Sequence, residues 1–260
     1  MTLLAIDIGN TRLKWALYSD TSLGQTPLFQ GAIFLEHLES FAEQQWQSLP
    51  EPAFIIGSCV AAPSVQASVD EQLAELWPRL TPWWVKVKQH QCGVTNGYDH
   101  PARLGVDRWV ALIGAKKHLQ QKKQNLPAIV VMIGTAVTVD ALDAEGNFIG
   151  GLIMPGHGIM LSALQKGTAG LHVPTGEVVP FPTNTSDALS TGGTYAIVGA
   201  IERMTINLQK HTGQTPKIFL TGGAAWKVAD SMTKPAQLIE SLIFDGILSV
   251  AEYLQKKISG

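Results

Sequence analysis

Two similar segments, each an apolar run, a glycine turn and a second apolar run, lie about half the chain apart in this 260-residue sequence. The first is Ala5–Thr11, with the letters AIDIGNT, and the second is Val130–Ala136, with the letters VVMIGTA. Buried strands form near-continuous apolar runs, and glycine permits a tight turn between them. The same order of predicted strands and helices follows in both halves. The repeat therefore predicts two related α/β domains that face each other.

Apolar runs and helical spacing predict the remaining elements. Strands are predicted over 3–8, 13–18, 53–57, 83–87, 128–133, 137–142, 148–154 and 217–220. Helices are predicted over 35–49, 64–77, 105–119, 159–166, 194–209 and 241–256, with Ser64 as a candidate cap of the second.

Composition excludes several classes of protein. With 45% hydrophobic and 15% charged residues, the chain can bury a sizeable core. A formal net charge of −2 argues against a broadly basic nucleic-acid-binding surface. Two cysteines, Cys59 and Cys92, are too few for a disulfide framework or a zinc site, and they fit a reducing cytosol. Without a basic n-region or an apolar stretch of about 18 residues, we expect a cytoplasmic protein with no signal peptide and no membrane span.

The residues from Asp7 to Lys14 combine a strand-end carboxylate, a glycine turn and a hydroxyl. Backbone N–H groups in such a turn suit phosphate, and the carboxylate of Asp7 suits Mg²⁺. Lys14 is near enough in sequence to reach the same phosphate. The alternatives are an ordinary hairpin turn and, for Lys14, a solvated strand position.

Three further glycine-containing segments extend this pattern. Gly134–Thr135 would hold phosphate from the other side, while Asp140 could orient water or a cation, or cap a strand end. The segment 150–156 could frame a ligand channel or form a simple turn. Gly222–Gly223 follow a predicted strand and precede a helix, which suits a nucleotide base or ribose.

The segment Gly105–Arg108 opens a predicted helix. The helix dipole alone favours an Asp in a first helical turn. The functional interpretation makes Asp107 a general base beside Arg108, whose planar guanidinium can bind a carboxylate or phosphate through two hydrogen bonds.

Taken in order, these motifs resemble the type III pantothenate kinases of the acetate and sugar kinase/Hsc70/actin superfamily. The matching pieces are 7–11, Tyr98 with Pro101, 105–108, 134–140, 150–156, 184–185 and 221–223. The resemblance implies two ribonuclease-H-like domains of the actin-like kinase type, with mixed sheets flanked by helices and the active site in the cleft. We expect the first domain at 1–115 and the second at 116–260, with the C-terminal helix able to pack back on the first.

The resemblance also implies the activity, which is ATP-dependent phosphorylation of pantothenate to 4'-phosphopantothenate, the first step towards coenzyme A. It makes Asp107 the base on the primary hydroxyl, places Mg²⁺ at Asp7 and implies a cytoplasmic homodimer with the substrate site close to the subunit interface. The pantothenate-binding residues would be Tyr98, Gly105, Val106, Asp107, Arg108 and Thr185. The ATP-binding residues would be Asp7, Ile8, Gly9, Asn10, Thr11, Arg12, Leu13, Lys14, Gly134, Thr135, Gly222 and Gly223.

One residue departs from the family pattern. Many members carry an Asp that binds a monovalent cation two residues before the glycine matching Gly134, and here that position is Met132. A thioether is a poor ligand for K⁺, which prefers oxygen. We therefore expect an altered K⁺ or NH₄⁺ site; the alternative is that another oxygen or the partner subunit replaces the ligand.

Two other functions are weighed against this one. A different enzyme of the superfamily, acting on a sugar or an acid, would share the fold, but Tyr98 and Gly105–Arg108 match the pantothenate side. A non-enzymatic accessory factor for transcription should show a basic face or a recognition helix, and the balanced charge argues against it. We expect ATP and pantothenate as ligands, with neither nucleic acid nor membrane as a partner.

Overall fold

The chain forms two compact units in the computed structural model, which describes residues 2–167 and 174–259. Unit 1 takes in residues 1–124 and 241–260, and unit 2 takes in residues 125–240. The first crossing between the units lies at 124/125 instead of the expected 115/116, because helix α2 (Val106–Gln121) continues past that position.

Unit 1 is built on a mixed sheet with the strand order β3-β2-β1-β4-β5. Its strands are β1 (Leu3–Ile8), β2 (Arg12–Tyr18), β3 (Phe29–Phe34), β4 (Phe54–Cys59) and β5 (Trp83–Trp84). β2 runs antiparallel to β1 and β3, while β4 runs parallel to β1 and β5. Every side chain of β1 is buried, as its apolar run predicts for a central strand.

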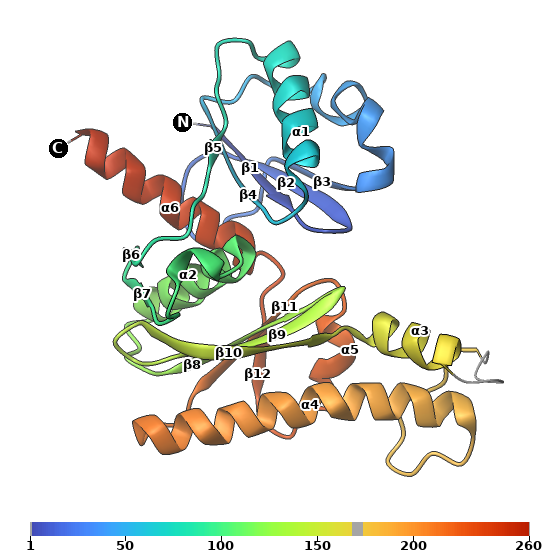
Figure 1. Ribbon diagram of the computed structural model, residues 1–260. Coiled ribbons are helices and arrows are strands. Elements are labelled where there is room, and N and C mark those ends of the chain that lie inside the picture. The colour runs from blue at the N-terminus through green and yellow to red at the C-terminus, as the bar shows by residue number, and fades with distance from the viewer. Residues whose placement is uncertain (1, 168–173, 260) are drawn as a thin grey trace. The chain divides into compact units, whose positions relative to one another are not determined.

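Helices cover both faces of this sheet (Figure 1). They are η1 (Leu35–Ser40), η2 (Ala42–Trp46), α1 (Pro63–Leu76), α2 and α6 (Leu242–Ser259). On one face η1, η2 and α1 enclose a core that contains Phe41, Trp46 and Leu73. On the other face α2 and α6 pack closely, because Gly114 and Gly246 leave no room for a Cβ between the two backbones. A Cβ on Gly246 would meet the carbonyl group of Val110.

Two details of these helices differ from the expectations. The region predicted as one helix over 35–49 is a 3₁₀ helix followed by a π-helical turn, because the backbone at His37 is not helical. α1 begins at Pro63, a residue suited to the first helical position, and Ala62 precedes it without a side-chain cap. The predicted cap at Ser64 is therefore wrong.

The segment that leads into α2 carries short elements. β6 (His90–Gln91) and β7 (Val94–Asn96) form an antiparallel pair, and η3 (Pro101–Arg103) follows them. These elements deliver the chain to Gly105, the residue before α2.

Unit 2 repeats the plan of a mixed sheet, with the strand order β12-β11-β8-β9-β10. Its strands are β8 (Ala128–Ile133), β9 (Ala136–Leu142), β10 (Asn147–Pro155), β11 (Lys217–Thr221) and β12 (Ala236–Leu238), and its helices are α3 (His157–Gly167), α4 (Thr185–Thr212) and α5 (Ala225–Ala229). β8–β9 and β9–β10 are antiparallel, and β8–β11 and β11–β12 are parallel. α4 packs along β8 and β9 over a core that includes Val131, Val139 and Ile201 (Figure 1).

The predicted α/β class, with two mixed sheets flanked by helices, is confirmed. Among the helices of the described ranges, none has the length and apolarity needed to cross a membrane.

Candidate active site

Asp7 lies buried near the end of β1, and its carboxyl group has a fixed neighbour on each adjacent strand. The parallel register pairs Asp7 with Ser58 of β4, whose hydroxyl donates a 2.8 Å hydrogen bond to Oδ1 of Asp7. The antiparallel register pairs Asp7 with Lys14 of β2. Burial raises the pKa of Asp7 to about 6; the bond from Ser58 opposes this rise, and the negative charge of Asp107 adds to it. Two acids from distant parts of the chain are therefore within electrostatic range in unit 1.

Asp107 stands in the first turn of α2, where Gly105 is the N-cap residue. Its Oδ1 accepts a 2.8 Å hydrogen bond from the backbone N–H of Arg108. A Cβ on Gly105 would lie 2.6 Å from that oxygen, so glycine leaves the space that the carboxylate occupies. Burial raises the pKa of Asp107, and the N–H and the charge of Arg108 oppose the rise. A carboxylate in this environment is a stronger proton acceptor than an ordinary surface Asp.

Arg108 and Tyr98 are joined next to this carboxylate. Nη1 of Arg108 donates a 2.8 Å hydrogen bond to the Tyr98 hydroxyl, and the guanidinium also lies 5.5 Å from the centre of the Tyr98 ring. Arg108 is 4% exposed. The side chain of Asn96 holds the loop beneath, because its Oδ1 accepts from the Tyr98 N–H and its Nδ2 donates to the Pro101 carbonyl. The structure thus brings Tyr98 together with Gly105–Arg108.

A glycine-lined turn joins β8 to β9 in unit 2. Within it the N–H of Gly134 donates to the carbonyl of Ala136 at 3.0 Å. Gly156 packs against this turn, and a Cβ there would meet the carbonyl oxygen of Gly134. Gly222, with φ +100°, lies against the backbone of Ile133. Exposed Thr135 and the Gly222–Gly223 segment, which the sequence assigns to ATP, therefore lie on neighbouring loops of unit 2.

Other predicted residues fall in separate places. Thr185 is exposed at the start of α4, after the N-cap residue Asn184. Met132 is buried on β8 between Thr138 of β9 and Thr221 of β11. Asp140 is 1% exposed in the middle of β9, so it is not a strand-end acid.

Two residues of the site were missed by the sequence analysis. Ser58 reaches Asp7 only through the register of strands that lie 51 residues apart in sequence, and no local pattern announces that pairing. Asn96 carried a usable signal, because Asn commonly hydrogen-bonds the backbone two residues ahead in a turn.

Comparisons with known proteins bear on the family of the chain. The family model for type III pantothenate kinase matches residues 3–207. A type III pantothenate kinase from Acidovorax ebreus is 59% identical over 251 residues, covering 96% of each chain. Those from Verminephrobacter eiseniae and Nitrosospira multiformis are 57% and 38% identical, covering 96% and 99% of this chain and 97% and 94% of their own.

Solved structures share the fold at low identity. A conserved Campylobacter jejuni protein, described as a Baf family transcriptional activator, superposes with a TM-score of 0.59 at 18% identity over 97% of this chain and 99% of its own. Component A of (R)-2-hydroxyglutaryl-CoA dehydratase from Acidaminococcus fermentans superposes with a TM-score of 0.50 at 13% identity over the full length of both. These likenesses concern the fold alone. The family model and the relatives at 38–59% identity show that this chain belongs to the type III pantothenate kinase family.

Proposed function

We propose that this chain transfers the γ-phosphoryl group of ATP to the primary hydroxyl of pantothenate, with Asp107 as the base. The product is 4'-phosphopantothenate, in the first step of coenzyme A synthesis. One observation carries the proposal: the partly buried Asp107 carboxylate stands beside the Arg108–Tyr98 pair and within electrostatic range of Asp7.

The step assigned to Asp107 is a proton transfer. As the pantothenate oxygen bonds to the γ-phosphorus, its proton passes to the Asp107 carboxylate, and the bond from phosphorus to the bridging oxygen breaks to release ADP. The raised pKa of Asp107 favours this role, because a general base works best when its pKa approaches the working pH. The bond from the Arg108 N–H keeps the acceptor at the helix start.

Pantothenate carries a carboxylate, so its pocket needs a cationic or polar clamp. We assign that clamp to Arg108 with Tyr98, whose hydrogen bond orients the guanidinium. The backbone of Gly105–Val106 lines the same helix start, where the dipole favours an anion. Thr185 is assigned to pantothenate on the family resemblance.

ATP binding is assigned to the turn and strand at 7–14 in unit 1, and to Gly134, Thr135, Gly222 and Gly223 in unit 2. The first turn is closed by a 3.0 Å bond from the Gly9 N–H to the Arg12 carbonyl. Asp7 suits a nucleotide-bound Mg²⁺, because this ion is commonly held by one or two carboxylates together with phosphates. Oδ1 of Asp7 accepts from Ser58, and Oδ2 has no hydrogen-bond donor within the described ranges. A divalent cation supplies charge neutralisation when bound with ATP.

The monovalent-cation site of the family does not fit the residues at Met132. A buried thioether stands where an oxygen ligand would be needed. The neighbouring Thr138 hydroxyl is buried and has no hydrogen-bond partner in the described part of the chain, but it is neutral and does not replace the charge of a carboxylate ligand. We therefore assign no step to K⁺ or NH₄⁺.

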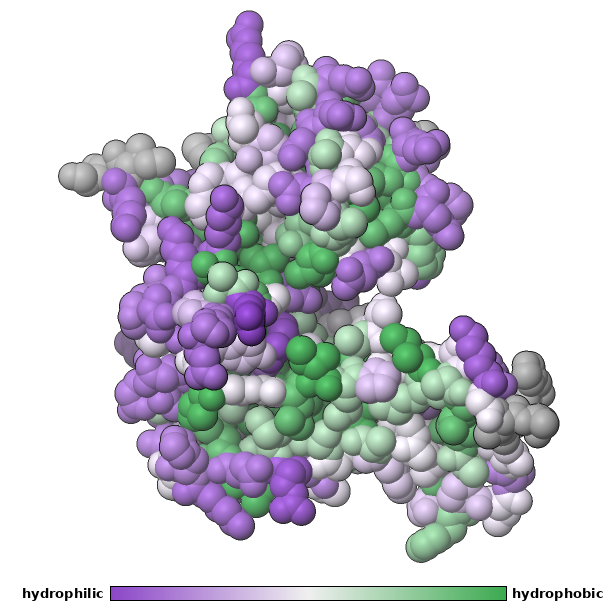
Figure 2. All heavy atoms as spheres, in the orientation of Figure 1, coloured by the Kyte–Doolittle hydropathy of each residue, from purple (hydrophilic) through white to green (hydrophobic). Residues whose placement is uncertain are grey.

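We assign a homodimer to the protein, acting in the cytoplasm. Apolar side chains gather over the strands of unit 2 on the face shown in Figure 2. On β10, Ile149, Leu152 and Ile153 are 42%, 37% and 65% exposed, and Ile159 of α3 is 45% exposed. Apolar surface of this kind often marks a protein interface. Light scattering on the purified protein would give twice the chain mass if this assignment is right, and the chain mass if it is wrong.

The function is tested by ADP release from Mg-ATP with and without pantothenate. We expect turnover that requires pantothenate and that is not supported by sugars or by acetate. ADP release that is indifferent to pantothenate, in a folded protein, would contradict the proposal.

A further inference from the structure

We infer that Phe34, an exposed aromatic residue of strand β3, is a positioning residue that holds the Arg12 guanidinium ready for the phosphates of ATP. This inference rests on the proposed function, because Arg12 belongs to the segment assigned to ATP. Phe34 itself lies outside every motif that the sequence analysis singled out. Its ring would act through Arg12 and would not touch the reacting atoms.

The contact between the two side chains is direct. The guanidinium carbon of Arg12 lies 4.0 Å from the centre of the Phe34 ring. The antiparallel register of β2 and β3 places the two residues opposite each other. A cation over the face of an aromatic ring is attracted by the ring quadrupole. The stack restricts the long Arg12 side chain to one region of the surface.

The backbone around the stack is tied to the proposed phosphate turn. The N–H of Gly9 donates to the Arg12 carbonyl, which closes the turn. The N–H of Leu35, the residue after Phe34, donates a 3.1 Å hydrogen bond to the Thr11 carbonyl. The end of β3, which carries Phe34, is therefore hydrogen-bonded to the turn itself.

The stack of Arg12 and Phe34 lies on the same face of the sheet as Asp7. Alternate residues of a strand share a face, so Arg12 lies on the face of Lys14, and Lys14 is paired with Asp7. Phe34 belongs to that face because it is paired with Arg12. The two cationic side chains and the buried Asp7 thus share one face of unit 1, which suits a polyphosphate with its metal ion.

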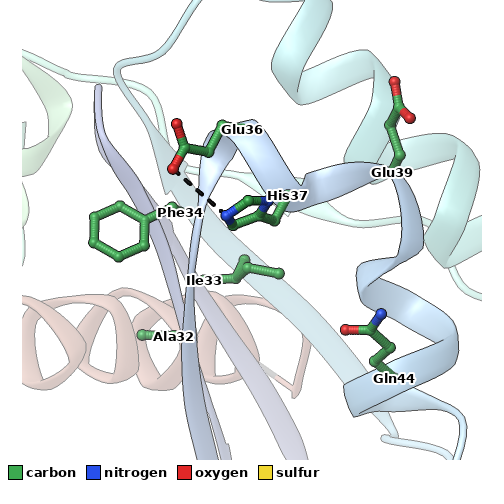
Figure 3. Close-up of a pocket in the computed structure, with 7 residues that line it drawn as sticks. All are labelled: Ala32, Ile33, Phe34, Glu36, His37, Glu39 and Gln44. Atoms are coloured by element: carbon green, nitrogen blue, oxygen red, sulfur yellow. Dashed lines mark ion pairs between the residues drawn. The ribbon is translucent and has the colours of Figure 1, made fainter.

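The guanidinium is available for an anion. In residues 2–167 and 174–259, no carboxylate forms an ion pair with Arg12. Glu36 is the acid nearest to Phe34 in sequence, and it forms an ion pair with His37 at 3.5 Å (Figure 3). Both residues line a cavity of about 480 Å³. Phe34 remains 40% exposed, so a bound ligand can reach the side chains at this position. An arginine that is held by an aromatic ring, without a counter-charge, loses less freedom when phosphate binds.

The test measures the affinity for a non-hydrolysable ATP analogue, Mg-AMPPNP, by calorimetry, and the KM values of the full reaction. Phe34→Leu keeps apolar bulk and removes the ring. We expect it to raise the Kd for Mg-AMPPNP and the KM for ATP about two- to fivefold, the factor that a cation–π contact at an exposed site is worth. The KM for pantothenate and the melting temperature stay at wild-type values, and Phe34→Tyr keeps the wild-type Kd.

Two controls separate the stack from general effects. Phe29→Leu removes an aromatic residue of comparable exposure, 48% against 40%, from the opposite face of the same strand and should leave the Kd unchanged. In an Arg12→Gln background, Phe34→Leu should have no further effect on the Kd. A wild-type Kd in Phe34→Leu overturns the inference, and so does equal weakening with or without Arg12. The Kd values for Mg-AMPPNP could follow this pattern across the variants while the wild-type protein makes no 4'-phosphopantothenate. In that case the proposed function fails and the role of Phe34 stands.

Discussion

The hydroxyl of Ser58 donates a 2.8 Å hydrogen bond to Oδ1 of Asp7 across two parallel strands at the centre of unit 1. This bond orients a carboxyl group that burial would otherwise favour in its neutral form. An acid that is held in an unfavourable environment usually serves binding or catalysis at the expense of stability. The effect of this buried acid on the stability of the protein can be measured without any substrate.

Replacing Asp7 by Asn should stabilise the protein while it abolishes ATP turnover. The pKa of Asp7 is about 6 in the folded state and 3.8 without the fold, so the native state binds the proton more tightly. The free energy of unfolding therefore falls as the pH rises from about 4 to about 6. At a pH of about 7.5, the free energy of unfolding of Asp7→Asn should exceed that of the wild-type protein by roughly 1–3 kcal/mol. Urea unfolding across this pH range, in EDTA without nucleotide, checks the prediction, and identical curves for both proteins would contradict it.

Replacing Asp107 by Asn tests the base. The amide keeps the shape and can still accept the N–H of Arg108, but it cannot take up the hydroxyl proton. We expect kcat to fall by roughly 10²–10⁴. Asp99→Asn, at an exposed position on the segment leading to the same helix, is the matched control. Wild-type turnover in Asp107→Asn would remove Asp107 from the mechanism.

Gly105→Ala tests the position of the same carboxylate without altering it. The added Cβ would lie 2.6 Å from Oδ1 of Asp107, and the flexible side chain can move away at little cost to folding. A displaced carboxylate stabilises the transition state less, and each loss of about 1.4 kcal/mol lowers kcat roughly tenfold. We expect kcat to fall at least tenfold, with little change in melting temperature. Gly199→Ala, where a Cβ meets open space, is the control. Unchanged kcat in Gly105→Ala would show that this placement of the carboxylate is not needed.

Arg108→Lys tests the pantothenate clamp. Lysine keeps the charge but loses the planar fork and the bond to the Tyr98 hydroxyl. The KM for pantothenate should rise about tenfold to a hundredfold, the worth of one hydrogen bond to a charged group. The KM for ATP should stay near its wild-type value. Arg103→Lys, an exposed change in η3, is the control, and an unchanged pantothenate KM in Arg108→Lys would place Arg108 outside the pocket.

Met132 leads to a prediction about monovalent cations. A buried thioether offers no good ligand for K⁺. Turnover in Mg-ATP and pantothenate should therefore be similar in Na⁺, K⁺ and NH₄⁺ at equal ionic strength. Initial rates in the three salts check this. A turnover rate that rises steeply with added K⁺ would show that the site still works through other oxygens.

Local patterns predicted the centre of each unit well. The strand over Leu3–Ile8 and the strand over Ala128–Ile133 are found with the predicted bounds, because each is an apolar run that ends at a glycine turn, with Asp7 as the one polar residue of the first run. The edge strand β3 was missed, since Phe29–Phe34 is half exposed and contains Gly31, which makes room for the Trp15 indole. A position at the edge of a sheet leaves little hydrophobic signal in the sequence.

The site shows the same division between local and distant information. The cluster Gly105–Arg108 is contiguous, so it could be singled out from the sequence, and the family resemblance supplied the role proposed for it. The contacts from Ser58 to Asp7 and from Phe34 to Arg12 depend on strand register, which tertiary structure determines. The expected boundary at 115/116 fell inside the predicted helix over 105–119, whereas the units change at 124/125, after α2 has ended.

The central claim is that Asp107 drives phosphorylation of the pantothenate hydroxyl. The most direct measurement is mass spectrometry of the products formed by purified protein, Mg-ATP and pantothenate, with Asp107→Asn alongside. The account predicts one 4'-phosphopantothenate for each ADP in the wild-type protein, and a rate lower by roughly 10²–10⁴ in the variant. ADP without phosphopantothenate, or equal rates in the two proteins, would contradict it.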